Sequence, residues 1–203
     1  MSSSDVTFRA PLNLAGPRVL LRPMVKEDAR GIFAYASDPA VTEFLTWDTH
    51  QSLADSEAFI ERALADPGRL TLVIQVEDWV AGCIGLTPIP RAFRAAELGY
   101  VLHRAFWGRQ YALEGATLAI TYGFETLHFN RIESLCAVPN ARSLRVLEKL
   151  GMKREGVVRE LRSFHGALPD MALYSVLRRE WHPPELGHHP HDGVDHTDPG
   201  DEV

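Results

Sequence analysis

One segment of this chain twice leads from a strand-like stretch into a helix-like stretch. The first strand, predicted over Ala95 to His103, leads through the turn Arg104 to Gly108 into a helix that begins near Arg109. The second strand, Arg131 to Val138, precedes a helix that opens at Asn140. The first N–H groups of a helix lack intrahelical partners and the helix dipole is positive there, so both openings favour a bound anion. Together they predict a long, phosphate-bearing ligand held along a sheet.

The rest of the pattern predicts an α+β domain. Strands are also predicted at Arg18–Met24, Leu70–Val76, Trp79–Thr87, Met152–Glu160 and Met171–Arg178, and helices at Lys26–Ser37 and Ser52–Ala65. The helix that begins near Arg109 should run to Leu127, because one apolar stripe recurs along it: Leu113, Ala116, Ile120, Phe124 and Leu127. Strands and helices mix without strict alternation, which predicts one sheet with helices on both faces.

Several predicted elements carry recognisable end signals. Ser52 followed by Asp55 resembles a capping box at the start of a helix. Gly151 is placed to end the helix that opens at Asn140, as a left-handed cap. His165-Gly166 is typical of a turn between the last two strands.

The net charge of −6 arises in residues 182–203, which hold six acidic and no basic residues; the remainder has 21 of each sign. A neutral folded part lacks the clustered basic charge of a nucleic-acid-binding surface. Residues 182–203 cannot bury enough apolar area to fold, so we expect one domain over 1–181 and a disordered acidic tail. The tail histidines match no closed metal site, which favours a solvated tail over weak metal binding: His188, His189, His191 and His196.

Other features of the sequence favour the reducing cytoplasm. No apolar run approaches the roughly 20 residues that cross a membrane, and the start Met-Ser-Ser-Ser-Asp does not resemble a signal peptide. Cys83 and Cys136 give neither a disulfide framework nor metal-ligand spacing. Cys136 is disfavoured as an acyl-accepting nucleophile because no histidine is near it in sequence. We expect a cytoplasmic protein with no membrane, metal or nucleic-acid partner.

Three sequence motifs follow one another from Glu97 onward. They are Glu97-Leu98-Gly99-Tyr100 with Phe106 to Ala112 and Glu114; Asn140 to Met152; and Glu155-Gly156 with Asp170 and Tyr174 ahead of Trp181. Together they resemble the GNAT superfamily of acyl-CoA-dependent N-acetyltransferases, and most of all its branch of ribosomal-protein alanine N-acetyltransferases. The resemblance extends more loosely from Leu20 to Trp181.

This resemblance implies a mixed, mostly antiparallel central sheet with a V-shaped splay between two strands. It also implies acetyl-CoA as co-substrate, no metal, and direct attack of a primary amine on the thioester in a ternary complex. The implied acceptor is a protein N-terminal α-amine, and the resemblance is compatible with a homodimer. The alternatives are a small amine acceptor, such as an antibiotic or metabolite, and an acyl-CoA-binding module without turnover.

The resemblance places Glu97 on the strand that lines the cleft, as a general base acting directly or through a water. A glutamate that faces solvent or forms a salt bridge is the alternative. At about pH 7.4 a lysine amine costs roughly 4 kcal/mol to deprotonate, whereas an α-amine costs under about 1 kcal/mol, so an α-amine acceptor weakens the requirement for a base. Tyr35, Phe44 and Trp47 are interpreted as core or lid residues on the acceptor side.

The resemblance also assigns residues to the cofactor. Backbone groups of Tyr100, Val101 and Leu102 would pair with its amide-bearing arm, although Tyr100 could equally be a packed aromatic. The pyrophosphate would be surrounded mainly by N–H groups of Arg104, Gly108, Arg109, Gln110, Tyr111 and Ala112. Arg109 either adds charge there or is an exposed first-turn cation, and Trp107 is interpreted as a packing residue.

One departure from the family pattern lies at Gln110, where the family usually has glycine. Glycine tolerates unusual dihedral angles and lets the backbone approach a ligand closely. Gln110 keeps its N–H, so the anion site survives if the local conformation is helical and the side chain points away. This residue motivates the alternative of a binding module without turnover.

The helix that opens at Asn140 supplies the remaining site residues. Asn140 is predicted as an N-cap, and the resemblance adds a hydrogen bond to the cofactor arm. Ser143 lies on the same helical face and is the candidate donor to the departing thiolate, with a capping hydroxyl as the alternative. A CoA thiol with a pKa of roughly 8 to 9, by analogy with cysteine, needs only a weak donor. Arg145 and Lys149 either reach the nucleotide phosphates or form a solvated basic face.

Overall fold

A computed structural model describes residues 13–89 and 94–186. Its centre is an eight-stranded sheet in the order β1-β2-β3-β4-β5-β6-β8-β7. The strands are β1 Leu14–Ala15, β2 Leu20–Pro23, β3 Leu70–Val76, β4 Trp79–Pro88, β5 Ala95–Leu102, β6 Arg131–Ala137, β7 Lys153–Val158 and β8 Met171–Leu177. Neighbouring strands are antiparallel except β5 and β6, which are parallel. The predicted α+β class and mostly antiparallel sheet are confirmed.

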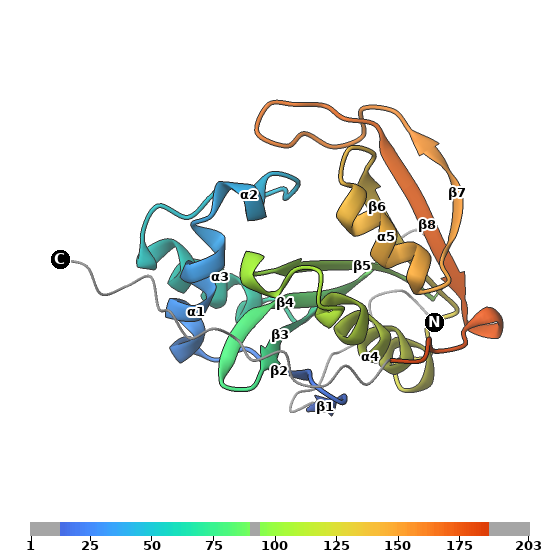
Figure 1. Cartoon of the computed structure of the whole chain (residues 1–203), viewed down its shortest axis with the longest axis horizontal. Coiled ribbons are helices and arrows are strands. Elements are labelled where there is room, and N and C mark those ends of the chain that lie inside the picture. Colours follow the sequence, from blue (N-terminus) through green and yellow to red (C-terminus); the bar gives the residue numbers. More distant parts are fainter. Residues whose placement is uncertain (1–12, 90–93, 187–203) are drawn as a thin grey trace.

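Helices cover both faces of the sheet (Figure 1). They are α1 Ala29–Ala36, α2 Pro39–Thr42, α3 Leu53–Ala65, α4 Tyr111–Glu125 and α5 Ala141–Lys149, with short 3-10 turns at Lys26–Asp28, Arg104–Phe106 and Arg178–Glu180. The pair α1 and α3 packs on one face, while α4 packs on the other and contacts α5. No helix in the described part of the chain is long and apolar enough to span a membrane.

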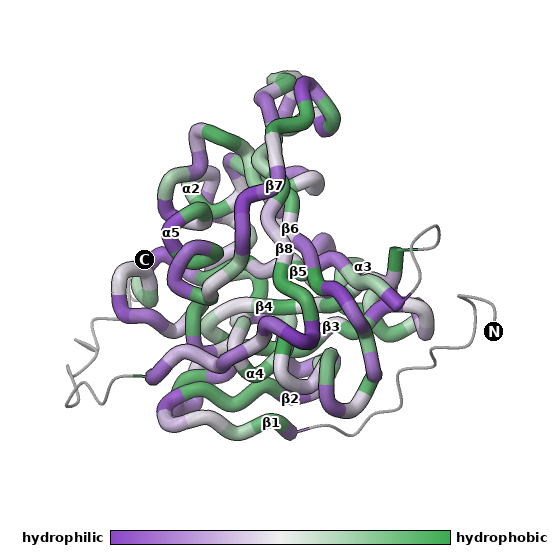
Figure 2. The backbone as a smooth tube through the Cα atoms, turned by 90° about the vertical axis from the view of Figure 1, so that its right-hand side faces the viewer, coloured by the Kyte–Doolittle hydropathy of each residue, from purple (hydrophilic) through white to green (hydrophobic). Residues whose placement is uncertain are grey.

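Two apolar clusters fill the space between the sheet and its helices. The larger lies under α4 and α5 and includes most of the predicted stripe: Leu113, Ala116, Ile120 and Phe124, each at most 4% exposed. The smaller lies under α1 and α3 and includes Ile32, Tyr35 and Ile60. Each large side chain buried in this way contributes roughly 1.5–3 kcal/mol of transfer free energy. Figure 2 shows a hydrophilic stretch in the edge strand β7, which is exposed along its length: it begins with Lys153, Arg154 and Glu155 and ends with the exposed Val157 and Val158.

The sheet opens between its two parallel strands. β5 and β6 pair over three residues only, from Ala95 opposite Arg131 to Glu97 opposite Glu133. Beyond Glu97, β5 continues along β4 as far as Leu102 but has no registered partner on β6. The backbone groups on that side of β5 are therefore available to a ligand. The predicted V-shaped splay is confirmed.

The end signals in the sequence correspond to the observed ends. Ser52 and Asp55 form a capping box at the start of α3, and Gly151, with φ of 72°, follows the end of α5. His165 and Gly166 both have positive φ in the turn between β7 and β8. These three predictions are confirmed.

The predicted helix Lys26–Ser37 is wrong in its first part. Lys26–Asp28 forms a 3-10 turn because the Asp28 carboxylate turns back to accept from the Val25 N–H at 2.8 Å and from Arg22 at 2.6 and 2.9 Å. The helix α1 proper begins at Ala29. The short helix α2, capped by the Asp38 side chain, had no predicted counterpart.

The predicted tail lies mostly outside the described residues. Residues 182–186 have no regular secondary structure, and Leu186 packs against the larger apolar cluster. Residues 187–203, with all four tail histidines, lie outside the described residues, so disorder there stays a prediction. Within the described part of the chain, no group of three or more His, Cys, Asp or Glu side chains is placed to hold a metal ion.

Candidate active site

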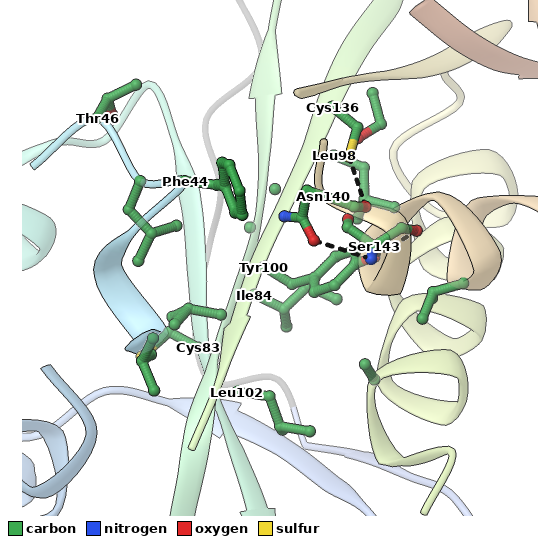
Figure 3. Close-up of a pocket in the computed structure, with 18 of the residues that line it drawn as sticks. Phe44, Thr46, Cys83, Ile84, Leu98, Tyr100, Leu102, Cys136, Asn140 and Ser143 are labelled. Atoms are coloured by element: carbon green, nitrogen blue, oxygen red, sulfur yellow. Dashed lines mark hydrogen bonds between the residues drawn. The ribbon is translucent and has the colours of Figure 1, made fainter. Parts of the chain in front are cut away.

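A cavity of about 1070 Å³ lies at the splay between β5 and β6. Figure 3 shows Phe44 and Thr46 on one wall and Asn140 and Ser143 on the other, with β4 and β5 between them. Most of the predicted site residues line this one cavity: Glu97, Tyr100, Val101, Leu102, Gly108, Gln110, Tyr111, Ala112, Asn140, Ser143, Arg145 and Lys149. The fold thus brings together residues that lie more than fifty positions apart in the sequence.

The loop before α4 differs from the prediction. Gln110 has φ of 65° and ψ of 8°, a left-handed conformation, so α4 begins at Tyr111 and the expected helical conformation at Gln110 is wrong. The chain needs a left-handed residue there to turn into α4, and Gly108 also has positive φ, 77°. Arg109 between them does not. Left-handed residues that alternate with ordinary ones can turn successive N–H groups toward one point, which makes a concave anion site.

The structure does not bring the side chains of Arg104 and Arg109 to the cavity wall. Arg104 forms an ion pair with Asp38, at 3.1 Å between Nε and Oδ2, and is 63% exposed. The Nη1 atom of Arg109 is buried without a hydrogen-bond partner among the described residues. The charge contribution of Arg109 to the cofactor site therefore stays a prediction. Main-chain contacts from both residues stay a prediction.

Trp107 packs as predicted, against both apolar clusters. Its indole N–H donates to the Leu102 carbonyl at 2.7 Å, which fastens the loop to the end of β5. The guanidinium of Arg142 lies 4.1 Å from the centroid of the Trp107 ring, a cation–π distance. Arg142 also lines the cavity and was missed by the sequence reasoning. Its spacing of three from Arg145 was the available signal, because residues three apart share a helical face.

Asn140 caps α5, as predicted. Its side-chain oxygen accepts from the Ser143 N–H at 3.2 Å. Because the oxygen faces the helix, the amide nitrogen is directed elsewhere, and Figure 3 shows it turned toward the cavity. That nitrogen is a hydrogen-bond donor on the cavity side of α5. The hydrogen bond to a cofactor stays a prediction.

A pair of hydroxyl groups links β5 to α5. The Tyr100 phenol lies 2.8 Å from the Ser143 hydroxyl. Side chains alternate along a strand, and Tyr100 points toward the α4 and α5 side together with Leu98 and Leu102. Burial raises the pKa of Tyr100, so the phenol keeps its proton at physiological pH. This contact was not predicted from the sequence, although strand alternation would have placed Tyr100 on that face.

The remaining candidates divide between cavity and core. Burial raises the pKa of the Cys136 thiol, which agrees with its interpretation as an inert cysteine. Tyr35 is a core residue, 1% exposed, whereas Phe44 and Trp47 line the cavity. Glu114, a motif residue, is fully buried away from the cavity and accepts from the Arg18 and Val19 N–H groups at 2.6 and 2.9 Å. Its part in the motif is therefore structural.

Glu97 is held by an arginine that the sequence reasoning missed. Nη1 and Nη2 of Arg162 donate to the two carboxylate oxygens of Glu97 at 2.8 and 2.7 Å. The hydrogen bond to Glu97 raises the pKa of Arg162. The partners lie 65 positions apart, and no local pattern marks Arg162, because the pairing depends on how the loop between β7 and β8 returns over β5. The salt bridge is the alternative left open for Glu97, and its role as a base stays a prediction.

The sequence and the fold both resemble those of known acetyltransferases. A family model described as acetyltransferase (GNAT) domain matches residues 18–153. The uncharacterized N-acetyltransferase p20 of Bacillus licheniformis is 31% identical over 81% of this chain and 95% of its own length. The structure of a GCN5-related N-acetyltransferase from Brucella melitensis, 26% identical, superposes with a TM-score of 0.76 over 85% of this chain and 81% of that one.

Similar proteins differ in the acceptors that their names state. The "Putative ribosomal N-acetyltransferase YdaF" of Bacillus subtilis (strain 168) is 32% identical over 59% of this chain and 66% of its own. The spermidine N(1)-acetyltransferase of Escherichia coli (strain K12) is 23% identical over 68% of this chain and 74% of its own. The microcin C7 self-immunity acetyltransferase MccE, solved with acetyl-CoA and AMP, shares the fold at 22% identity, with a TM-score of 0.74 over 80% of this chain and 93% of its own.

Proposed function

This chain belongs to the GNAT family of acetyltransferases, and from that premise we propose that it transfers the acetyl group of acetyl-CoA to the α-amine of a protein N-terminus. Membership makes it an acyltransferase. The acetyl-CoA complex of MccE supports the same donor for this chain. The α-amine acceptor and the roles of individual residues are the proposal, and the geometry of the cavity supports them as follows.

The acetyl-CoA molecule is proposed to lie in the splay. Its amide-bearing arm would pair with the open backbone edge of β5 at Tyr100 and Val101, opposite the Asn140 amide nitrogen. Its pyrophosphate would meet the N–H groups of the left-handed loop from Gly108 to Ala112. The nucleotide phosphates would lie near Arg142, Arg145 and Lys149, which are cations that line the cavity on α5.

The transfer step needs an amine, a thioester and a place for the thiolate. The amine nitrogen forms a bond to the acetyl carbonyl carbon, the carbon–sulfur bond breaks, and CoA leaves as the thiolate with that electron pair. The nitrogen gives up its proton to Glu97, directly or through a water, and Glu97 then releases it to solvent. The thiolate ends as thiol by taking a proton from solvent. The Ser143 hydroxyl stabilises the thiolate by donating a hydrogen bond, which is a weaker demand than giving up its proton.

The observation that carries the α-amine proposal is the pairing of Glu97 with Arg162. A carboxylate that already accepts from both nitrogens of a guanidinium must give up part of that pairing before it can accept a proton from an amine. Such a site suits an acceptor whose amine needs little help to lose its proton. An α-amine costs under about 1 kcal/mol to deprotonate at neutral pH, against roughly 4 kcal/mol for a lysine side chain.

The charges that line the cavity also disfavour a polyamine. Among the described residues, its carboxylates are Asp66 and Glu97, while its cations are Arg62, Arg69, Arg142, Arg145, Lys149 and Arg162. Asp66 accepts from the Gly68 N–H at 2.9 Å, and Glu97 is bound by Arg162. Arg142, Arg145 and Lys149 are assigned above to the cofactor phosphates, so a polycation such as spermidine would meet few available carboxylates and the remaining cations Arg62, Arg69 and Arg162.

A substrate scan tests the proposal. Purified protein and acetyl-CoA are combined with N-terminal peptides, spermidine, an aminoglycoside and an Nα-blocked lysine peptide, and free thiol release is followed. We expect the highest kcat/KM with peptides that have a free α-amine. A higher kcat/KM with spermidine or the aminoglycoside would replace the proposed acceptor with a small amine. Calorimetry with acetyl-CoA checks the donor independently of any acceptor.

A further inference from the structure

An ion pair stands inside the acceptor side of the cavity. Glu97 on β5 and Arg162 in the loop between β7 and β8 both line the cavity. Their side chains are 26% and 32% exposed, so both charges are largely removed from water. The guanidinium of Arg162 and the carboxylate of Glu97 form a fork of two parallel hydrogen bonds, at 2.8 and 2.7 Å, which fixes the orientation of both groups. In Figure 1 the loop that carries Arg162 arches above the sheet from β7 to β8.

Open space lies directly beside this pair. Every second residue of a strand lies on the same face, so Glu97, Gly99 and Val101 share one face of β5. This face is turned toward α1 and α3, because Val101 packs against the smaller apolar cluster. A Cβ atom on Gly99 would meet nothing within 4 Å, and Gly99 is exposed in the middle of the strand. Across this floor, Figure 3 shows the Phe44 ring turned into the cavity. The face of β5 next to Glu97 is therefore open at Gly99, where an acceptor can lie.

An acceptor that reaches this pair must compensate both charges. A simple alkylamine would bind Glu97 and leave the guanidinium of Arg162 without an acceptor in a partly desolvated place, which is costly. An amine with a carbonyl group on the adjacent carbon supplies both partners. Its nitrogen donates to Glu97 while its carbonyl oxygen accepts from Arg162. Peptide N-termini and α-amino amides have this arrangement, whereas lysine side chains and polyamines do not.

We infer that Glu97 and Arg162 together form an acceptor clamp that selects α-amines by their neighbouring carbonyl oxygen. The inference rests on the proposed function and adds a substrate-specificity role for Arg162. Arg162 binds the acceptor carbonyl. The hydrogen bonds between Arg162 and Glu97 are then replaced by hydrogen bonds to the acceptor, so that neither charge is left without a partner. Selection then depends on the distance between amine and carbonyl, not on the amine alone.

The test compares two tripeptides that differ by one methylene. One begins with alanine and the other with β-alanine, which moves the amine one carbon farther from the first carbonyl. For each peptide, kcat/KM of a variant is divided by kcat/KM of the wild type. The difference in amine pKa between the two peptides therefore cancels. We expect Arg162→Ala to lower kcat/KM about 10- to 100-fold for the alanine peptide, the usual effect of losing a hydrogen bond to a charged group, and to change the β-alanine peptide by less than about threefold.

Two further variants control the result. Arg159→Ala removes an exposed arginine from the same loop, outside the cavity lining, and should change neither peptide. Arg162→Lys keeps the charge but not the fork and should fall between wild type and Arg162→Ala for the alanine peptide. An equal loss for both peptides in both Arg162 variants would overturn the clamp. If wild type acetylates neither peptide, the proposed function itself fails.

Discussion

Asn140 combines a structural and a proposed binding role in one side chain. Its oxygen caps α5 and its nitrogen faces the cavity. Asn140→Ser keeps an oxygen acceptor for the cap but removes the amide donor. We expect a melting temperature near that of wild type and an acetyl-CoA affinity weaker by about 1–2 kcal/mol, measured by calorimetry. Asn140→Ala should lose both, so its additional loss of stability measures the cap. An unchanged affinity in the serine variant would reduce Asn140 to a cap.

Tyr100 is proposed to act through Ser143 rather than on the substrate. A phenol that keeps its proton can donate to the Ser143 oxygen, which leaves the serine proton free for the thiolate. Tyr100→Phe should lower kcat about 3- to 10-fold, the worth of one hydrogen bond, with no change in the dissociation constant of acetyl-CoA. Adding it to Ser143→Ala should cause no further loss of kcat. If the two losses multiply, Tyr100 acts independently of Ser143.

Residue by residue, sequence reasoning identified the groups that belong to local motifs. Asn140 and Ser143 share a helical opening, and their spacing already placed them on one face. Arg162 and the hydroxyl contact of Tyr100 escaped it because they depend on pairings across 65 and 43 positions. Arg109 shows the converse. Its position in a motif suggested a ligand contact, but its side chain is not among those that line the cavity.

At the scale of elements, the turn into α4 is the feature that the sequence misjudged. A helical start at Arg109 would have satisfied the apolar stripe equally well, because the stripe begins only at Leu113. The stripe reports which face of a helix is buried, not where its first turn lies. The conformation of Gln110 is imposed by the path from β5 into α4. It is therefore a tertiary property that overrides local preference.

Two variants at Gln110 isolate the cost of that conformation. Gln110→Gly and Gln110→Ala both remove the carboxamide, but only alanine retains a Cβ in the left-handed region. We expect the glycine variant to exceed the alanine variant by about 1 kcal/mol in free energy of unfolding, from urea titration. Both should bind acetyl-CoA within about threefold of wild type, because the proposed contacts are main-chain N–H groups. A large loss of affinity in both would assign the site to the glutamine side chain.

The central sheet of the molecule is continuous where β5 pairs with β6, which we call the closed end of the splay, and opens beyond Glu97, where the two strands no longer pair. The resemblance predicted this opening, because strand order and pairing follow from the family pattern. The network that holds the closed end was not foreseen. Arg131 binds Glu133 at 2.7 Å and Glu155 at 2.6 Å, and Ser175 donates to Glu155 at 2.6 Å. These contacts fasten β6, β7 and β8 where β6 still pairs with β5.

This network makes stability depend on pH in a predictable direction. Hydrogen bonds from Arg131, and then from Ser175, lower the pKa of Glu155 to about 2. In the unfolded chain its pKa returns to about 4.3, so the stabilisation is complete above that value and is lost as the pH falls toward 2. Because the Glu155 side chain is 40% exposed, we expect it to contribute at most about 1 kcal/mol.

Urea unfolding of wild type and Glu155→Gln at several pH values measures this contribution. At pH 7 the wild type should have the higher urea midpoint, and the difference should shrink steadily as the pH falls from about 5 to 3. Glu57→Gln, an exposed glutamate on α3, serves as the control and should show no such trend. A difference that stays constant over this range would mean that Glu155 acts through packing rather than charge. The closed end of the splay would then be held by the apolar contacts of β6 and β8 alone.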